Sequence, residues 1–162
     1  ASMVRNAEAK DASQIASIYN YYIENTTVSF EEKSVTREEM ESRINDYTKA
    51  YPWLVYEENG KILGYCYATK WRVRSAYKYS AETSVYVDKD CHGKGIGTGL
   101  YTELVRRCKE QGIHVLVAGI ALPNEKSQKI HEKIGFKKIA HFEEIGRKCD
   151  SWIDVGYWEY KL

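Results

Sequence analysis

Three glycines alternate with other residues in the segment His92-Gly93-Lys94-Gly95-Ile96-Gly97. Glycine tolerates left-handed backbone conformations, so this segment can turn tightly and expose main-chain N–H groups. Apolar residues at helical spacing follow it, and the N-terminus of a helix attracts anions through its free N–H groups and its dipole. The segment, together with Thr98, is therefore a candidate phosphate-binding loop. The alternative is a tight strand-to-helix turn that binds no ligand.

The glycine spacing excludes two common nucleotide-binding motifs. A dinucleotide fingerprint, Gly-x-Gly-x-x-Gly, would need a third glycine where Thr98 or Leu100 stands. A nucleotide-triphosphate loop would need Ser or Thr directly after Gly93-Lys94, where the chain has Gly95. A phosphate group bound here must therefore belong to another kind of ligand.

Side chains elsewhere in the chain suit proton transfer or the binding of an acid group. Glu82 begins a segment rich in β-branched residues, where burial would suit it to act as a general base; the alternative is a surface carboxylate. His131 follows Ser127 by one helical turn and could donate or accept a proton, or simply face solvent. Arg72 and Arg74 could grip a carboxylate with paired N–H groups, or line a solvated strand face.

The periodicity of the apolar residues predicts the elements that hold these side chains. Capping pairs such as Asp11 with Gln14 and Thr36 with Glu39 precede apolar helical faces, and β-branched or alternating runs indicate strands. In chain order we expect helices over 11–24 and from 36 to before 51, a hairpin of 53–56 with 62–69, a strand over 81–87, a helix from the glycine loop to 111, a strand over 115–120, a helix over 125–134 and a strand over 155–162. This order predicts a single α+β or mixed α/β domain over residues 3–162.

Composition narrows the class of protein. The 24 Lys and Arg against 23 Asp and Glu leave a net charge of +1, which disfavours non-specific binding of nucleic acid but leaves a local basic patch open. No apolar run approaches the roughly 20 residues of a membrane span, and the first residues do not resemble a secretory signal. We therefore expect no nucleic-acid or membrane partner and a cytoplasmic location. The four cysteines lack metal-ligand spacing, which predicts free thiols and no metal site.

Over the whole chain, the sequence resembles the GNAT superfamily of N-acetyltransferases, and within it the phosphinothricin N-acetyltransferase branch, which also acetylates methionine sulfone and sulfoximine. The glycine loop is similar to the family's [Gln/Arg]-x-x-Gly-x-Gly/Ala loop, except that His92 stands where Arg or Gln is usual. Asn124, Ser127 and His131 resemble the second cofactor element of the family. The other matching segments are Glu24–Phe30, Tyr51–Val55, Ala81–Val87, Leu122–Asn124, Ile130–Glu132 and Trp152–Gly156.

The resemblance implies a GNAT-like acyl-CoA fold, with a central, mostly antiparallel sheet flanked by helices, and acetyl-CoA as acetyl donor. It implies direct transfer to a small-molecule amine, with Glu82 as general base and His131 as proton donor or base. The cofactor-binding residues it implies are Val85, Tyr86, Val87, His92, Gly93, Lys94, Gly95, Ile96, Gly97, Thr98, Asn124, Ser127 and Lys133. From their own chemistry, the candidate substrate-binding residues are Arg72 and Arg74 as anion-binding groups, Phe30, Tyr77 and Tyr86 as walls, and Glu82 beside the amine. Members of this branch are commonly homodimers, which makes the aromatic-rich segment 152–158 a candidate contact surface.

Two other functions stay open at this point. The acceptor could be a protein N-terminus, a lysine side chain or a polyamine, although a polyamine site would favour carboxylates over Arg72 and Arg74. A non-catalytic acyl-CoA sensor would keep the loop without needing Glu82 and His131. The sequence also leaves open the physiological acceptor, the choice between acid and base for His131, and the geometry of a dimer.

Overall fold

The two N-terminal helices form where capping residues precede an apolar face. In the computed structural model, which describes residues 1–162, α1 spans Ala12–Asn25 and α2 spans Arg37–Tyr47. The Thr36 hydroxyl accepts the Glu39 N–H at 3.1 Å and caps α2, as its spacing predicts. The helix predicted over 11–24 is confirmed as α1, but the predicted capping pair of Asp11 with Gln14 was wrong, because the Asp11 carboxylate accepts the N–H of Glu8, 2.8 Å away, in a capping box one turn earlier. No helix of the structure is long and apolar enough to cross a membrane.

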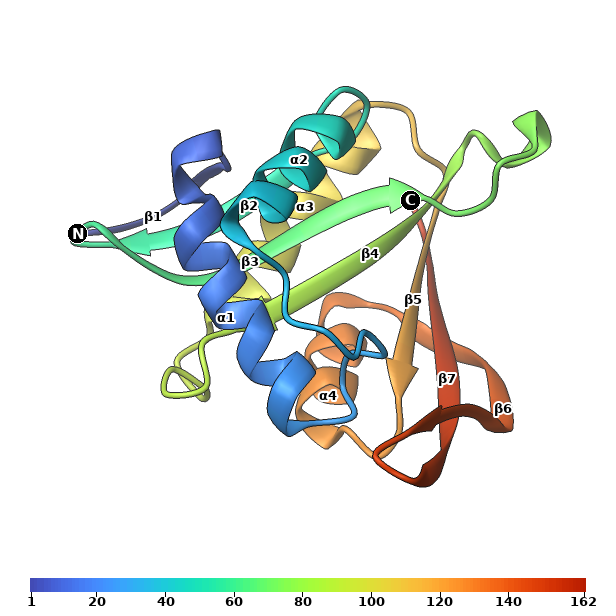
Figure 1. The fold of residues 1–162 in the computed structure, drawn as a ribbon. Helices are drawn as coiled ribbons and strands as arrows, with labels where there is room; N and C mark the ends of the chain where they lie inside the picture. Colours follow the sequence, from blue (N-terminus) through green and yellow to red (C-terminus); the bar gives the residue numbers. More distant parts are fainter.

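A seven-stranded sheet lies between the helices, with α1 and α2 packed on one face and α3 and α4 on the other (Figure 1). Every neighbouring pair of strands is antiparallel except β4 and β5, which confirms the expected mixed fold and mostly antiparallel sheet. The spatial order is β1-β2-β3-β4-β5-β7-β6. The bounds are β1 Ser2–Asn6, β2 Trp53–Glu58, β3 Lys61–Lys70, β4 Ser80–Val87, α3 Ile96–Glu110, β5 Val115–Ala121, α4 Glu125–Ile134, β6 Lys137–Lys148 and β7 Ser151–Lys161, with single 3-10 turns at Ala9–Asp11 and Ser75–Tyr77.

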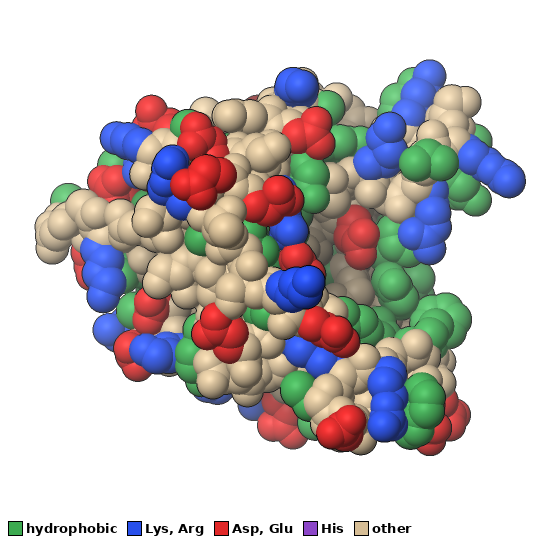
Figure 2. Space-filling view, viewed as in Figure 1, with side chains coloured by type: hydrophobic (Ala, Val, Ile, Leu, Met, Phe, Trp, Pro, Cys, Tyr) green, Lys and Arg blue, Asp and Glu red, His purple; other side chains and the backbone are tan.

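The sheet divides between β4 and β5. These strands pair only where Ser80–Glu82 face Val115–Val117, and they separate beyond that point (Figure 1). Strand β3 pairs with β4 along 81–87, so the residues of β4 beyond Glu82 have a strand on one side only. The surface is hollowed on this face, between the projecting segment after β3 and the β6–β7 end of the sheet (Figure 2). The opening therefore reaches the middle of the molecule.

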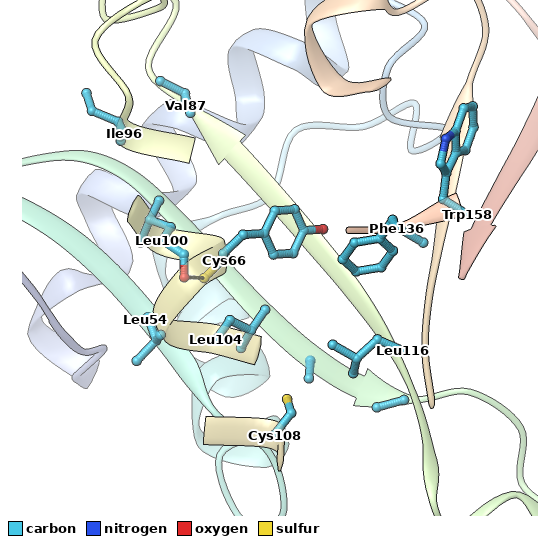
Figure 3. Packing of buried hydrophobic residues seen from close by; sticks show 14 of the residues in the cluster. Leu54, Cys66, Val87, Ile96, Leu100, Leu104, Cys108, Leu116, Phe136 and Trp158 are labelled. Atoms are coloured by element: carbon cyan, nitrogen blue, oxygen red, sulfur yellow. Dashed lines mark hydrogen bonds between the residues drawn. The ribbon is translucent and has the colours of Figure 1, made fainter. Parts of the chain in front are cut away.

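Two hydrophobic clusters hold the layers together. Leu100, Leu104 and Cys108 of α3 pack against the sheet face that carries Leu54 and Cys66 (Figure 3). These five side chains are fully buried, so each contributes the greater part of its transfer free energy to folding. The geometry of α3 is thereby fixed against the strands, and with it the position of the glycine loop at its N-terminus.

Aromatic rings form much of the cluster on the opposite face. The ring centroids of Tyr19, on α1, and Tyr86, on β4, lie 5.0 Å apart in an edge contact. Trp53 and Tyr67, on neighbouring strands, stack with centroids 4.4 Å apart. Contacts of this geometry add to the free energy of simple burial. The cluster fixes α1 over the central strand, and so positions the chain that leaves α1.

The sequence did not predict strands β1 and β6, and β7 begins four residues earlier than expected. Both missed strands are at the edges of the sheet, and most of their side chains are exposed. Strand β6 also bulges between Lys138 and Ala140 and between Phe142 and Gly146, which interrupts its alternation. A buried face with a period of two is the signal of a strand in a sequence, and neither edge strand carries it clearly.

Candidate active site

The glycine loop joins β4 to α3 through left-handed backbone. Gly93 has φ +82° and Gly95 has φ +75°, and a Cβ added at either would meet nothing within 4 Å. The positive φ angles, and not a lack of space for a side chain, therefore favour glycine at both positions. The first hydrogen bond of α3 runs from the Gly99 N–H to the Gly95 carbonyl, 3.0 Å away. The N–H groups of residues 96–98 have no acceptor within the helix and are available to an anion.

Gly97 is constrained by a neighbouring helix instead. A Cβ at this position would lie 2.8 Å from Cδ1 of Ile130, on α4. Real Cβ atoms do not approach so closely, so the missing side chain allows α4 to pack against the start of α3. This packing brings the second predicted cofactor element next to the first.

His92 lies half-buried beside the loop. Its Nε2 is 3.0 Å from the hydroxyl of Tyr22, which also donates to the Val87 carbonyl. Burial lowers the pKa of His92, the charge of Lys126 lowers it further, and Asp88 raises it in part. The imidazole is therefore mainly neutral near pH 7. Lys126, in the first turn of α4, adds a cation near the loop that the sequence analysis did not single out.

A narrow channel of about 40 Å³ lies between the separated parts of β4 and β5. Asn124 caps α4 beside it, with Oδ1 accepting the Ser127 N–H at 3.2 Å, which leaves the side-chain NH₂ as a donor for another group. The predicted residues Val85 and Tyr86 also line the channel, whereas Val87 is buried without lining it. The full lining is Val28, Thr83, Ser84, Val85, Tyr86, Tyr101, Gly119, Ile120, Ala121, Asn124, Ser127 and His131.

His131 is buried in a chain of hydrogen bonds at the channel wall. Its Nδ1 donates to the Ser127 carbonyl at 2.7 Å, and its Nε2 lies 2.8 Å from the Tyr101 hydroxyl. That hydroxyl is also 3.1 Å from Oγ1 of Thr83, on β4. Burial lowers the pKa of His131, while the bond to the Ser127 carbonyl raises it in part. Because burial disfavours the charged form, the imidazole is mainly neutral, while the Tyr101 hydroxyl donates its own proton to Thr83.

A larger cleft of about 1060 Å³ opens on the other side of β4. It corresponds to the hollow in Figure 2, where hydrophobic side chains gather along the right-hand wall. The structure brings five predicted substrate-binding residues together in its lining: Phe30, Arg72, Tyr77, Glu82 and Tyr86. The sixth, Arg74, is exposed and does not line the cleft.

Glu82 is the last residue of β4 that pairs with β5 before the sheet divides. Burial raises the pKa of its carboxyl group above the usual range, and the positive charge of Arg72 lowers it in part. The Arg72 guanidinium stacks on the indole of Trp71, with Cζ 3.9 Å from the ring centroid. A partly desolvated carboxylate with a cation nearby can accept a proton from one end of an amino acid while the cation binds the other end.

Tyr157, on β7, lines the cleft next to a residue that the cleft shares with the channel. Burial raises the pKa of its hydroxyl, and the charge of Glu82 raises it further. The ring lies over Gly119, where an added Cβ would be 3.0 Å from Cε1 of Tyr157. Gly119 lines both the cleft and the channel, as do Tyr86 and Val28. The two spaces therefore meet beside the central strand.

The sequence did not predict the far wall of the cleft, and two predicted basic residues, Arg74 and Lys133, line neither the cleft nor the channel, so their roles stay predictions. The apolar side chains Ile139, Phe142 and Ile145 line the cleft from β6, an element that was not predicted. Lys133 is exposed in the last turn of α4 and lines neither space. The concentration of aromatic residues in segment 152–158 could have indicated Tyr157 as a site residue, but it was interpreted as a candidate contact surface of a dimer.

Comparison with known proteins agrees with this geometry. The family model described as Acetyltransferase (GNAT) domain matches residues 4–156. Phosphinothricin N-acetyltransferase of Streptomyces viridochromogenes is 36% identical over 156 residues, which cover 96% of this chain and 85% of that protein. L-methionine sulfoximine/L-methionine sulfone acetyltransferase of Salmonella typhimurium is 32% identical, covering 98% of this chain and 94% of that protein.

A solved structure extends the similarity to the fold. The phosphinothricin acetyltransferase from Sinorhizobium meliloti, crystallised in complex with acetyl-CoA, superposes with a TM-score of 0.95 at 32% identity. The match covers 99% of this chain and 88% of that chain. The likeness therefore includes both sides of the divided sheet.

Proposed function

Because this chain belongs to the acetyltransferase (GNAT) family, we propose that it transfers the acetyl group of acetyl-CoA to the α-amine of a small amino-acid analogue. Family membership confirms the predicted fold, the N-acetyltransferase class and acetyl-CoA as acetyl donor. Phosphinothricin, methionine sulfoximine and methionine sulfone are the acceptors we propose, on the basis of the relatives' names. The observation that carries the proposal is that the channel and the cleft share Tyr86 and Gly119, while Glu82 lines the cleft.

In this proposal, the glycine loop and the channel bind acetyl-CoA. The N–H groups of residues 96–98 hold the diphosphate, with the cations of Lys94 and Lys126 close to the loop. The side-chain NH₂ of Asn124 donates to the pantetheine arm in the channel. When bound, acetyl-CoA supplies a thioester, which is already activated toward attack by an amine.

The cleft binds the acceptor and prepares its amine. Arg72 pairs with the carboxylate or phosphinate group of the acceptor, and Phe30, Tyr77 and Tyr86 form apolar walls. Glu82 takes a proton from the ammonium group, directly or through water, because a raised pKa makes the carboxylate a better base. The neutral amine can then attack the thioester carbonyl without an acetyl-enzyme intermediate. The C–N bond forms as the C–S bond breaks, and the departing CoA thiolate takes up the proton that the attacking nitrogen loses.

His131 acts in its neutral form in this scheme. Both ring nitrogens already bond to protein groups, Nδ1 to the Ser127 carbonyl and Nε2 to the Tyr101 hydroxyl. Burial disfavours the charged imidazolium, so the lowered pKa of His131 favours a neutral base over an acid. The sequence left open whether His131 is a proton donor or a base, and we propose that it is a base.

The acceptor class is tested by measuring release of free CoA. L-phosphinothricin, methionine sulfoximine and methionine sulfone are compared with spermidine and a panel of peptides at equal concentration. We expect turnover with the three amino-acid analogues and little with spermidine. Turnover with the peptides or with spermidine alone would contradict the proposed acceptor while leaving the enzyme class unchanged.

We also propose a single domain over residues 3–162, a homodimer and a cytoplasmic location. Exposed apolar side chains support self-association: Val73 is 86% exposed, Trp152 62% and Ile145 60%. Four free cysteines support a reducing compartment. Sedimentation velocity tests the dimer, with a single species at the monomer mass as the contrary result.

A further inference from the structure

Lys148, the last residue of β6, is a buried cation that the proposed chemistry does not use. Its side chain is only 5% exposed. The ammonium group donates to the Ile23 carbonyl at 2.9 Å and to the Ser29 carbonyl at 2.5 Å. Ile23 lies in the last turn of α1, where carbonyls have no partner within the helix, and Ser29 belongs to the segment that leaves it. One side chain of β6 therefore bonds to two main-chain groups on the opposite side of the cleft.

Gly146, two residues earlier on the same strand, supports the same segment. A Cβ at this position would lie 2.6 Å from two atoms of the Phe30 ring. The Phe30 ring therefore packs directly against the backbone of β6, which is possible only because Gly146 has no side chain. Phe30, Ser29 and Gly146 all line the acceptor cleft. Two independent contacts thus join the chain after α1 to the end of β6.

Other contacts hold this segment from the helices on its own side. The Arg43 guanidinium, on α2, binds both carboxylate oxygens of Glu31 at 2.8 and 2.7 Å. The Tyr19 hydroxyl, on α1, lies 2.8 Å from Oγ of Ser29. The Arg43 hydrogen bond is the main cause that lowers the pKa of Glu31, and the charge of Lys148 lowers it further. These bonds fix the segment to α1 and α2, but they do not set its distance from β6.

We propose that Lys148 is a positioning residue, which holds residues 26–31 against β6 and so sets the width of the acceptor cleft at Phe30. The inference rests on the proposed function, since it assigns Phe30 to the acceptor wall. Removing the ammonium group would leave two buried carbonyls without a donor, and the segment would move to reach water. Phe30 would then leave its contact with Gly146, and the cleft would widen where the acceptor side chain lies.

The first test replaces the ammonium group by an apolar side chain of similar length. In Lys148→Met we expect the KM for L-phosphinothricin to rise about ten-fold, while the dissociation constant of acetyl-CoA changes less than about two-fold. Amide hydrogen exchange of residues 26–31, measured without acceptor, should become faster. Lys137→Met, at an exposed lysine on the same strand, is the matched control and should change neither quantity.

A double-mutant cycle distinguishes positioning from a general loss of stability. Because Lys148 acts through Phe30, the effects of Lys148→Met and Phe30→Ala on kcat/KM should be strongly non-additive, whereas Lys148→Met and Arg72→Ala should add. Gly146→Ala displaces the Phe30 ring without altering Lys148, and should raise the acceptor KM in the same way. Additive effects with Phe30→Ala, or unchanged exchange of residues 26–31, would overturn the inference. If the unaltered protein acetylates no amino-acid analogue, the proposed function fails. The exchange experiment, which is measured without acceptor, still shows whether Lys148 holds residues 26–31.

Discussion

At the scale of single residues, the degree of burial of each charged group in the cleft decides what that group can do. Glu82 is partly buried, and burial raises the pKa of its carboxyl group. Arg72 remains exposed, but stacking on Trp71 fixes the direction of its guanidinium. The same cleft thus contains a proton acceptor, the partly buried Glu82, and an anion-binding group, the exposed Arg72.

Removing the carboxylate tests its role as base. We expect Glu82→Gln to lower kcat at least about ten-fold, because general-base catalysis typically contributes that much or more. The dissociation constant of acetyl-CoA should change little, since Glu82 does not line the channel. Steady-state kinetics and calorimetry measure the two quantities, and an unaltered kcat would remove Glu82 from the mechanism.

The pH dependence of the reaction follows from the direction of the same pKa shift. Only the ionised carboxylate can accept a proton, so kcat/KM should fall as the pH drops through the pKa of Glu82. Because burial raises that pKa, the fall should begin at a higher pH than for an exposed glutamate. A pH profile of kcat/KM checks this, with Glu82→Gln expected to lose the acidic limb.

The two arginines provide a matched pair for the acceptor. Arg72 lines the cleft and Arg74 does not, although the sequence predicted both as substrate-binding residues. Arg72→Ala should raise the KM for acceptors that carry an acid group by about ten-fold or more, as expected for the loss of a charged pair. Arg74→Ala should change it much less. Equal losses with acceptors that lack an acid group would contradict the assignment of Arg72.

At the scale of elements, the close approach of α3 and α4 decides where the cofactor elements meet. Gly97→Ala should destabilise the fold by about 1–3 kcal/mol, the usual cost of overpacking, because the new methyl group would collide with Ile130. Ile130→Val removes the colliding atom, so the double variant should be more stable than the sum of the single effects predicts. Thermal unfolding of the three variants measures this. Simple additivity would show that the contact does not limit the packing.

Elements with a buried periodic face could be predicted from the sequence, and edge elements could not. Helix α4 was predicted with its observed bounds, because Asn124 and Gly135 mark its two ends. Strand β6 lacks a buried alternation, since its residues lie at the edge of the sheet. The far wall of the cleft depends on that strand, which explains why the apolar lining and Lys148 were missed. The glycine loop and Glu82 were predicted mainly from the resemblance to the family, because their residue types alone also fit a tight turn and a surface carboxylate.

At the scale of the whole molecule, the divided sheet couples ligand binding to stability. Acetyl-CoA in the channel would contact both β4 and α4, which belong to different sides of the opening. A ligand that binds only the folded state, at a hundred times its dissociation constant, stabilises it by about 2.7 kcal/mol. We therefore expect acetyl-CoA to raise Tm in a concentration-dependent way. Lys94→Ala should need more ligand for the same rise, which thermal shift titrations can measure.

The parallel join between β4 and β5 comprises three residue pairs in the middle of the sheet. The hydrophobic cluster on the α3 face, which contains Ala81 of β4 and Leu116 of β5, holds the two sides of this seam together, and bound acetyl-CoA would add contacts across the opening beyond it. The abundance of the native protein in a cell should then follow the supply of acetyl-CoA. Starvation for that metabolite would reduce both the rate of the reaction and the lifetime of its catalyst.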